Sequence, residues 1–391
     1  MGTPPVRVCH VITRMILGGA QENTLHTCHG LQQRGWDVLL ITGPPIGPEG
    51  ELLSTVRRLG IPCAVVPALR RPIAPLRDAR AFVELVRLLR WFGPAIVQTH
   101  SSKAGILGRF AARAANVPVI VHTIEGLPFH RYAPRALNAA YIRAERQAAR
   151  VTDHIVCVAR AMQDQAVRAG IRPRGGYSLI YSGLDVASHL RAAPLRAAAR
   201  RRLGIAPADV VIGKVARLFD LKGHEFVIRA LPAVLARCPQ ARCLFVGDGP
   251  LRIELARLAG QLGVAHRVSF AGLVSPEEVP ATISAMDVLV HASLREGLPR
   301  VLVQGLLCEK PVVAFALDGA PEVILDGITG RLVEPESVQG LADALLEAVE
   351  HPEQALRMAR EGRRRFAGRF SIDTMVHATE ALYRDLLARR P

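Results

Sequence analysis

Short apolar runs alternate with longer stretches of helical periodicity along most of the chain. The runs that predict strands are 6–12, 38–41, 96–99, 119–122, 155–158 and 179–181 in the first half, and 210–215, 243–246, 268–271, 288–291 and 312–315 in the second. Helical patterns such as 22–34 and 79–91 separate them. Because strands that alternate with helices are typical of parallel sheets covered on both faces, we expect an α/β protein with doubly wound, Rossmann-like sheets.

The alternation pauses once, near the middle of the chain. Ser182-Gly-Leu-Asp185 follows the sixth apolar run, and an Ala/Arg-rich helical stretch, 187–202, precedes the seventh. A chain of 391 residues is also longer than one ordinary core supports. We therefore expect a first domain over 1–185, a second over 186–372, and a C-terminal helix over 373–391 that could pack back on the first. The segment 337–390 has helical character, with breaks near Pro352 and Phe370.

The composition is that of a globular protein, with 50% hydrophobic and 21% charged residues. No apolar run is long enough to span a bilayer, and the N-terminal residues lack the apolar core of a signal peptide. The seven cysteines are scattered, odd in number and form no C-x-x-C pair, which indicates reduced thiols and no zinc site. These features predict a cytoplasmic protein.

The charge is basic and uneven. The net charge is +16; residues 1–185 carry 23 Lys and Arg against 11 Asp and Glu, whereas residues 186–391 carry 27 against 23. A basic half suits nucleic acid, an anionic membrane surface or an acidic substrate, although an ordinary solvated surface has the same composition. Aromatic residues make up only 5% and no stacking motif is visible, so we expect no nucleic-acid partner.

In the second half, two strands are followed by turns that prepare a helix start. The turns are 295–299 and 318–322, and each contains a proline. Proline suits the first helical position, so Pro299 and Pro321 predict two helix starts whose free N–H groups can bind a polar, anionic ligand. Side by side in a parallel sheet, such turns form a crevice at the carboxyl ends of the strands.

Other turns of the second half suit a phosphorylated ligand. Arg217 and Lys222 follow the run 210–215 and precede a helical pattern. At such a position the forked guanidinium of Arg217 and the point charge of Lys222 suit a diphosphate. The alternative is that both are surface cations. Gly247 ends another strand, where backbone can approach a ligand closely. Val274 lies where a flat base could rest against backbone.

The turns of the first half carry glycine and histidine. Gly18 and Gly19 open a helix after the first strand; they do not form G-x-G-x-x-G, and they suit either a phosphate cradle or a plain tight turn. His100-Ser-Ser-Lys103 and the polar segment 122–130 follow two later strands. Polar clusters at strand ends are expected in a cleft.

Taken in order, these segments resemble glycosyltransferase family 4, whose members are retaining sugar transferases of the GT-B fold. The matching segments are Gly18-Gly-Ala-Gln, His100-Ser-Ser-Lys-Ala-Gly, His122-Thr-Ile-Glu-Gly-Leu-Pro-Phe-His, Arg217 with Lys222-Gly, Gly247-Asp-Gly-Pro, Phe270-Ala-Gly, Glu296-Gly-Leu-Pro with Gln304, Pro311-Val-Val-Ala and Gly319-Ala-Pro-Glu. The resemblance covers nearly the whole chain. It implies two Rossmann-like domains that face each other across a cleft, with a nucleotide-diphosphate sugar as co-substrate held mainly by the second domain.

The resemblance also implies donor-side roles. Arg217 and Lys222 would neutralise the diphosphate, and the Gly18–Gly19 turn would close on it. Further donor-binding positions are Gly247, Val274, Gly297, Leu298, Arg300 and Gln304. Glu296 is a catalytic candidate that would hold the sugar hydroxyls together with neighbouring backbone N–H groups. Gln304 replaces a second glutamate that commonly binds the ribose, so it can still accept a hydrogen bond, but without charge.

On the acceptor side, the family's T-x-H-G turn has Glu125 in place of its histidine. Glu125, the second catalytic candidate, could act as a general base for an acceptor hydroxyl or only bind a hydroxyl. His122 and His130 are rival candidates for this role. His100 and Lys103 complete the acceptor-side set.

These features predict a glycosyltransferase of polysaccharide biosynthesis. It would transfer a sugar from a UDP- or GDP-sugar to a hydroxyl of a glycan or lipid-linked acceptor, with retention. Because no D-x-D motif occurs and Arg217 and Lys222 can serve the diphosphate instead, we expect no metal and no cofactor. A catalytically inactive nucleotide-sugar-binding protein and a sugar-nucleotide epimerase on the same fold are the alternatives.

A basic amphipathic segment, 129–150, predicts contact with an anionic membrane surface. Leu137, Tyr141 and Ile142 lie near one stripe, and several arginines face only one acid, Glu145. The alternative is an ordinary domain helix with a solvated basic face. Membrane binding would make the protein peripheral on the inner membrane face and would favour a lipid-linked acceptor.

Overall fold

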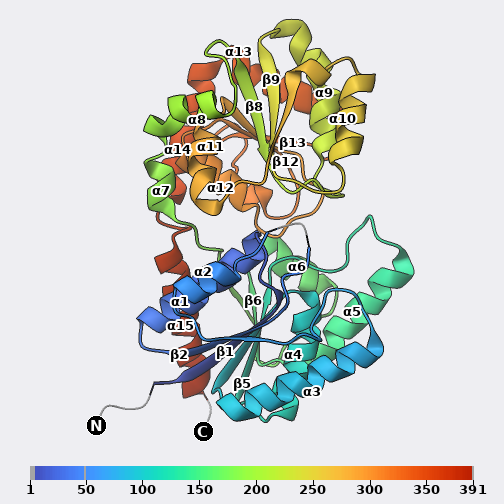
Figure 1. Cartoon of the computed structure of the whole chain (residues 1–391), viewed down its shortest axis with the longest axis vertical. Coiled ribbons are helices and arrows are strands. Elements are labelled where there is room, and N and C mark those ends of the chain that lie inside the picture. The colour runs from blue at the N-terminus through green and yellow to red at the C-terminus, as the bar shows by residue number, and fades with distance from the viewer. Residues whose placement is uncertain (1–4, 48–49, 390–391) are drawn as a thin grey trace. The chain divides into compact units, whose positions relative to one another are not determined.

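The computed structural model describes residues 5–47 and 50–389, which fold into two compact units. The first unit runs to Gly183 and resumes at Ile372, and the second is Leu184–Ser371. The chain therefore passes from the first unit into the second and back, and its last helix belongs to the first unit (Figure 1). The sequence placed the domain boundaries after residues 185 and 372.

Seven parallel strands form the sheet of the first unit, in the order β3-β2-β1-β4-β5-β6-β7. They are β1 (Arg7–Arg14), β2 (Asp37–Gly43), β3 (Cys63–Val65), β4 (Ile96–His100), β5 (Val119–Ile124), β6 (His154–Cys157) and β7 (Tyr177–Leu179). The helices are α1 (Gly19–Gln33), α2 (Leu53–Arg58), α3 (Pro75–Phe92), α4 (Ser102–Ala114), α5 (Arg135–Ala149), α6 (Arg160–Arg168) and α15 (Ile372–Ala388). The strand order switches direction between β1 and β4, the position at which open α/β sheets bind ligands.

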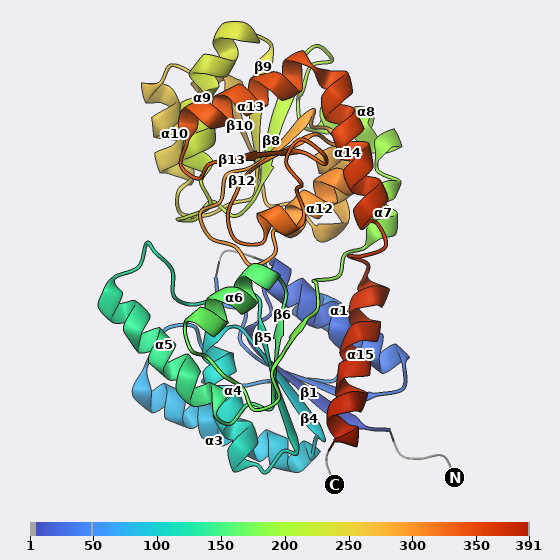
Figure 2. The ribbon, with the colours of Figure 1, turned by 180° about the vertical axis from the view of Figure 1, so that it is seen from behind.

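Helices cover both faces of this sheet. Val8 packs in one apolar cluster with residues of α1 and α15, whereas its neighbour Cys9 packs in a second cluster with residues of α3 and α4. Successive strand residues point to opposite faces, so a strand buried on both sides needs an almost continuous apolar run. α1 and α15 lie side by side on their face of the sheet (Figure 2).

The second unit contains a six-stranded parallel sheet in the order β10-β9-β8-β11-β12-β13. Its strands are β8 (Val210–Val215), β9 (Ala241–Val246), β10 (Val268–Gly272), β11 (Val288–His291), β12 (Val312–Phe315) and β13 (Arg331–Val333). Its helices are α7 (Val186–Leu190), α8 (Arg196–Arg202), α9 (His224–Arg237), α10 (Arg252–Gln261), α11 (Val279–Ser284), α12 (Arg300–Leu307), α13 (Val338–Glu350) and α14 (Pro352–Phe366). Here the switch point lies between β8 and β11, beside the turns that the sequence singled out.

The expected second helix start at Pro321 is wrong. Residues Ala320–Glu322 form a single 3-10 turn, in which the N–H groups of Val323 and Ile324 both bond to the carbonyl of Ala320. The helical pattern ends after this turn, and the chain then reverses at Gly327, whose φ is +69°. Pro299 itself lies immediately before α12, and Arg300 is the first helical residue.

Two further local predictions were wrong. The run 187–202 is not one helix but α7, a 3-10 turn and α8, because Pro194 in the turn cannot donate a helical hydrogen bond. The predicted strand 179–181 is Tyr177–Leu179 instead, because its partner β6 ends at Cys157. None of the helices in the described part of the chain is both long and apolar enough to cross a membrane.

Candidate active site

In the second unit, the turn between β11 and α12 holds a carboxylate by contacts from neighbouring elements. The Nζ of Lys222 lies 2.7 Å from Oε1 of Glu296, and Nε2 of His291 lies 3.5 Å from the same oxygen. The backbone N–H of Glu296 donates to the carboxylate of Asp318, 2.8 Å away. The predicted residues Lys222 and Glu296, 74 positions apart, are thus brought into direct contact.

The electrostatics of this turn keep Glu296 ionised. Burial alone would raise the pKa of Glu296, but the charge of Lys222 and the close approach of His291 outweigh it and hold that pKa well below its usual range. The side chain is still 20% exposed, so the carboxylate remains accessible to a ligand. An accessible carboxylate beside the first N–H groups of a helix offers both an acceptor and donors to a polyhydroxylated ligand.

Three buried basic side chains beneath this turn were missed by the sequence analysis. Lys214 on β8 is fully buried, and its Nζ has no hydrogen-bond partner within the described residues. Burial lowers the pKa of Lys214 to about 7, although Glu296 opposes the shift. Burial likewise lowers the pKa of His224 and His291. In the sequence, the only sign of a buried lysine was the position of Lys214 inside the apolar run 210–215.

The other donor-side positions have more ordinary surroundings. Arg217 follows β8, and its guanidinium lies 4.8 Å from the ring centroid of Phe219. Gly247 has a φ of +131°, and a Cβ there would lie 2.2 Å from the carbonyl oxygen of Ala216, so the close backbone approach is to a neighbouring loop of the protein. Among the remaining donor-side residues, Gly297 and Leu298 are buried, and Val274, Arg300 and Gln304 are half-buried. Gly18 lies immediately before α1, and Gly19 is the first residue of that helix.

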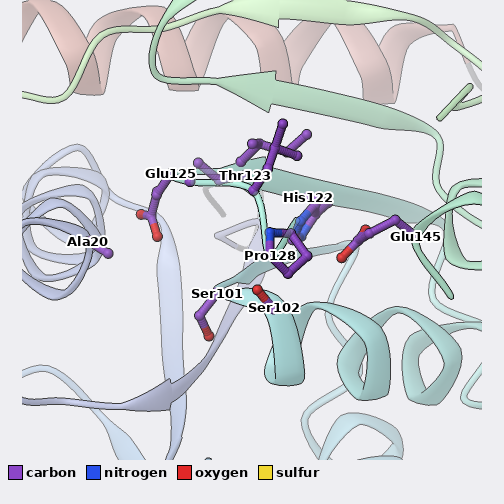
Figure 3. A pocket seen from close by; sticks show the side chains of 11 residues that line it. Ala20, Ser101, Ser102, His122, Thr123, Glu125, Pro128 and Glu145 are labelled. Carbon is purple, nitrogen blue, oxygen red and sulfur yellow. The ribbon is translucent and has the colours of Figure 1, made fainter. Parts of the chain in front are cut away.

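In the first unit, the carboxyl ends of β4 and β5 border a pocket of about 210 Å³. Its lining residues are Ala20, Ser101, Ser102, His122, Thr123, Ile124, Glu125, Gly126, Leu127, Pro128 and Glu145. Glu125 and Glu145 lie on opposite sides of His122 in Figure 3, and the two serines mark the start of α4. The pocket therefore gathers carboxylate, hydroxyl and imidazole groups from β5, α4, α5 and the segments that follow β4 and β5.

Glu125 is held on one side and unpaired on the other. Its Oε1 lies 3.3 Å from Nδ1 of His100, and the side chains of the two residues are only 9% and 1% exposed. The second carboxylate oxygen, Oε2, has no hydrogen-bond partner among the residues that the structure describes. A buried carboxylate oxygen without a partner is costly, so this atom is suited to accept a ligand's hydroxyl.

The rival acceptor-side candidates lie differently. His122 is fixed by Oγ1 of Thr99, 2.9 Å from its Nδ1, and burial together with Arg109 lowers its pKa well below the usual value. The backbone of His130 bonds to the side chain of Asn138, and His130 does not line the pocket. Lys103 pairs with Asp78 and also donates to a backbone carbonyl, so its side chain ties α4 to α3.

A buried ion pair beside the pocket was not anticipated. Nη2 of Arg109 lies 2.6 Å from Oε2 of Glu145, and the two side chains are 0% and 5% exposed. Glu145 was expected to be the one acid among the surface arginines of α5, but it points inward. A single acid in a basic helix was the available signal. Within the described ranges, no three His, Cys, Asp or Glu side chains are gathered to hold a metal ion.

Comparison with known proteins finds a matching family model in each half of the chain. The model "Glycosyl transferases group 1" matches residues 196–365, and the model "Glycosyl transferase 4-like domain" matches residues 18–176. The chain is 26% identical over 388 residues to the Escherichia coli UDP-Gal:alpha-D-GlcNAc-diphosphoundecaprenol alpha-1,3-galactosyltransferase, covering 98% of each chain. It is 31% identical over 280 residues, 70% of each chain, to the GDP-mannose-dependent alpha-(1-6)-phosphatidylinositol monomannoside mannosyltransferase of Mycolicibacterium smegmatis.

Solved structures agree on the fold. Anabaena Alr3699/HepE in complex with UDP-glucose superposes with a TM-score of 0.83 at 24% identity, covering 96% of this chain and 99% of that one. Sucrose-phosphate synthase from Thermosynechococcus elongatus gives a TM-score of 0.81 at 21% identity, covering 98% and 99%. At these identities the likeness concerns the fold, and it confirms the predicted pair of Rossmann-like domains of the GT-B type.

Proposed function

This chain belongs to the group 1, GT4-type glycosyltransferases, and from that premise we propose that it transfers a sugar from a UDP- or GDP-sugar to a hydroxyl of a lipid-linked glycan. We further propose that transfer occurs with retention and without a metal. Two similar enzymes are named for UDP-Gal and GDP-mannose as donors, and both names include lipid acceptors. These names support the substrate class.

The contact between Lys222 and Glu296 carries the proposal. An ionised carboxylate suits the hydroxyls of a sugar ring, and an ammonium group suits the adjacent diphosphate. Because Lys222 already neutralises Glu296, a diphosphate that reached this turn would share the same cation. Arg217 would add a second positive charge, which is the electrostatic work that a metal performs in other sugar transferases.

The neutral residue at position 304 predicts a weaker ribose contact. Gln304 is half-buried on α12 and can accept a hydroxyl hydrogen bond with its amide oxygen. A neutral acceptor contributes roughly half as much as a carboxylate. We therefore expect the diphosphate and sugar contacts to dominate donor affinity.

The pocket of the first unit is our proposed acceptor site, with Glu125 as its base. The Oε2 of Glu125, which has no partner among the described residues, suits an incoming hydroxyl, whereas the Nδ1 of His122 is hydrogen-bonded to Thr99. An ionised glutamate can accept the hydroxyl proton during transfer. This arrangement favours Glu125 over His122 for the acceptor-side role.

An exposed face on α3 supports a membrane-borne acceptor. Leu76 is 91% exposed and Trp91 is 75% exposed, and both lie on the helix face that also carries Arg80 and Arg87. Large apolar side chains among arginines suit the surface of an anionic bilayer. On α5, Leu137 is also exposed, and the inward position of Glu145 leaves that helix surface more basic than its sequence suggested.

One assay separates the candidate functions. The protein would be incubated with UDP-, GDP- and ADP-sugars, with an undecaprenyl-diphosphate-linked glycan or a soluble glycan as acceptor. We expect acceptor-dependent release of nucleotide that persists in EDTA, and a product whose anomeric coupling matches that of the donor. Interconversion of the donor sugar would indicate an epimerase, and tight donor binding without release would indicate a binding protein.

A further inference from the structure

A continuous set of buried polar side chains links the C-terminal helix α15 to the pocket that holds Glu125. The hydroxyl of Tyr383 on α15 donates to Oε1 of Gln98 on β4, and it lies 3.4 Å from Nε2 of His10 on β1. Nδ1 of His10 lies 3.0 Å from Nε2 of His100, and Nδ1 of His100 lies 3.3 Å from Glu125. Figure 2 shows α15 beside β1 and β4.

The protonation state of Tyr383 determines which partner donates in each hydrogen bond of this set. Burial raises the pKa of the Tyr383 phenol well above its usual value, so the phenol keeps its proton. Because that proton is donated to Gln98, the phenol oxygen can only accept from His10. In this orientation of the Gln98 amide, its Nε2 donates to Oγ1 of Thr123 at 2.5 Å.

The next two links are then determined. Burial and the neighbouring His100 lower the pKa of His10 well below its usual value, so His10 is neutral and carries one ring proton. If that proton is on Nε2, then Nδ1 of His10 is an acceptor and Nε2 of His100 must donate to it. The remaining nitrogen of His100 faces the carboxyl group of Glu125.

We propose that Tyr383 and His10 are positioning residues that fix the tautomer of His100 and thereby keep one proton shared between His100 and Glu125. A hydrogen bond at that contact exists only as imidazolium with carboxylate, or as imidazole with carboxylic acid. The first form leaves Oε2 of Glu125 ready to accept a hydroxyl. When the pair loses its shared proton, two lone pairs face each other, and Glu125 is no longer held. The link to catalysis rests on the proposed acceptor role of Glu125.

The other titratable and charged groups beside these hydrogen-bonded side chains each keep one protonation state. Arg109 on α4 is paired with Glu145, and burial keeps His122 on β5 neutral by lowering its pKa. Cys28 on α1 packs in the same apolar cluster as Tyr383, whereas Cys9 points to the other face of the sheet. Burial raises the pKa of both thiols, so both stay protonated.

Histidine tautomers can be observed directly by long-range ¹H–¹⁵N NMR spectra of ¹⁵N-histidine-labelled full-length protein. His10, assigned from the signals lost in His10→Gln, should be the Nε2–H tautomer. In Tyr383→Phe the phenol oxygen is absent, so we expect His10 to change to the Nδ1–H tautomer. Thr379→Val is the matched control, because it removes another buried hydroxyl of α15, one that donates to the carbonyl of Met375 in the same helix.

A wild-type His10 in the Nδ1–H form would overturn the proposal, as would an unchanged tautomer in Tyr383→Phe. The wild-type spectrum decides the first point even if Tyr383→Phe does not fold. Neither NMR measurement needs enzymatic activity, so both test this proposal independently of the proposed function.

The pH profile of sugar transfer tests the consequence. In the wild type, turnover should fall on the alkaline side when the pair loses its proton. In Tyr383→Phe, neutral His100 can donate its Nδ1–H to Glu125, so we expect the alkaline fall to move up by at least one pH unit. Thr379→Val should keep the wild-type profile. Identical profiles for all three proteins would mean that Tyr383 and His10 do not influence the proton shared by His100 and Glu125.

Discussion

The two candidate carboxylates are each held by cations or imidazoles that come from other elements. Glu296 contacts Lys222 and His291, and Glu125 contacts His100. A carboxylate fixed at one oxygen keeps the other oriented, and this preorganisation is what an active site requires. The consequence is that removing a partner should alter chemistry more than fold.

Glu296→Gln should reduce the rate of sugar transfer by about 100-fold, because a charged contact to the reacting sugar is lost. Donor affinity, measured by calorimetry, should change far less. Glu309→Gln is a suitable control, since Glu309 pairs with Arg360 and Arg363 at the far end of α12. A near-normal rate for Glu296→Gln would remove Glu296 from the mechanism.

Arg217→Ala and Lys222→Ala should each weaken the binding of a nucleoside diphosphate at least tenfold. Charge-assisted contacts of this kind contribute about 1.5–3 kcal/mol each. Arg229→Ala provides the control, because Arg229 is an exposed cation on α9. The decisive comparison is with the free nucleoside: equal losses for nucleoside and diphosphate would show that the cations do not contact the diphosphate.

Lys214→Met should stabilise the protein, most strongly at and below neutral pH. The folded-state pKa of Lys214 is about 7, well below the ordinary value of about 10.4, so between these values the unfolded chain binds more protons. Wild-type stability should therefore rise with pH through this window, and the advantage of Lys214→Met should shrink. Below pH 7 the advantage should be on the order of a few kcal/mol.

Urea unfolding of both full-length proteins at pH 6.5 and pH 9 measures this difference. A constant difference across that range would show that Lys214 keeps its charge in the folded protein. A destabilised Lys214→Met would show that the amine has a partner that compensates for its burial.

Sequence could identify residues whose role is local and not those that depend on distant contacts. Glu296 and Lys222 stand on turns with recognisable proline and glycine neighbours, so their place at strand ends could be predicted. Tyr383 meets His10 across 373 positions, and that contact depends on how α15 packs against the sheet. Lys214 and His10 were visible only as polar residues inside apolar runs.

At the scale of elements, strands with continuous apolar runs were predictable and short edge strands were not. β8, β11 and β12 have the predicted bounds, because two buried faces demand apolar residues at almost every position. β3 and β13 have only three residues each, which is too short to show any period. Pro321 has the sequence of a helix start, but only one 3-10 turn forms there.

The packing of α4 against β5 leads to a test at this scale. A Cβ at Gly105 would lie 2.6 Å from Cε1 of His122, and His122 is held by Thr99. Gly105→Ala should therefore cost about 1–3 kcal/mol of stability, despite the better helix propensity of alanine. Gly260→Ala on α10 meets nothing within 4 Å and should instead gain about 0.5–1 kcal/mol.

Thermal unfolding of both glycine variants, with the transfer rate measured alongside, checks this contrast. Equal and small effects would mean that His122 can move aside. In that case His122 would have room to turn toward a ligand, and its exclusion from the acceptor-side role would have to be withdrawn.

At the scale of the whole molecule, charge and exposed apolar surface coincide in the first unit. Residues 1–185 carry 23 Lys and Arg against 11 Asp and Glu. Within this unit, α3 exposes Leu76, Val83 and Trp91 among its arginines. The sequence pointed to α5 as the membrane contact, but α3 exposes more large apolar side chains than α5 does. Both helices pack against α4 (Figure 1).

We therefore predict that the protein sediments with anionic vesicles at low salt and is released by about 0.5 M salt, because exposed charges are screened. Leu76→Ser combined with Trp91→Ser should weaken binding at least tenfold, since burying each side chain contributes about 1.5–3 kcal/mol. Ile253→Ser is the matched control, because Ile253 is 82% exposed on α10 of the second unit. Equal losses for control and double variant would exclude α3 as the membrane contact. If the wild type ignores anionic vesicles even at low salt, a soluble acceptor becomes the better proposal.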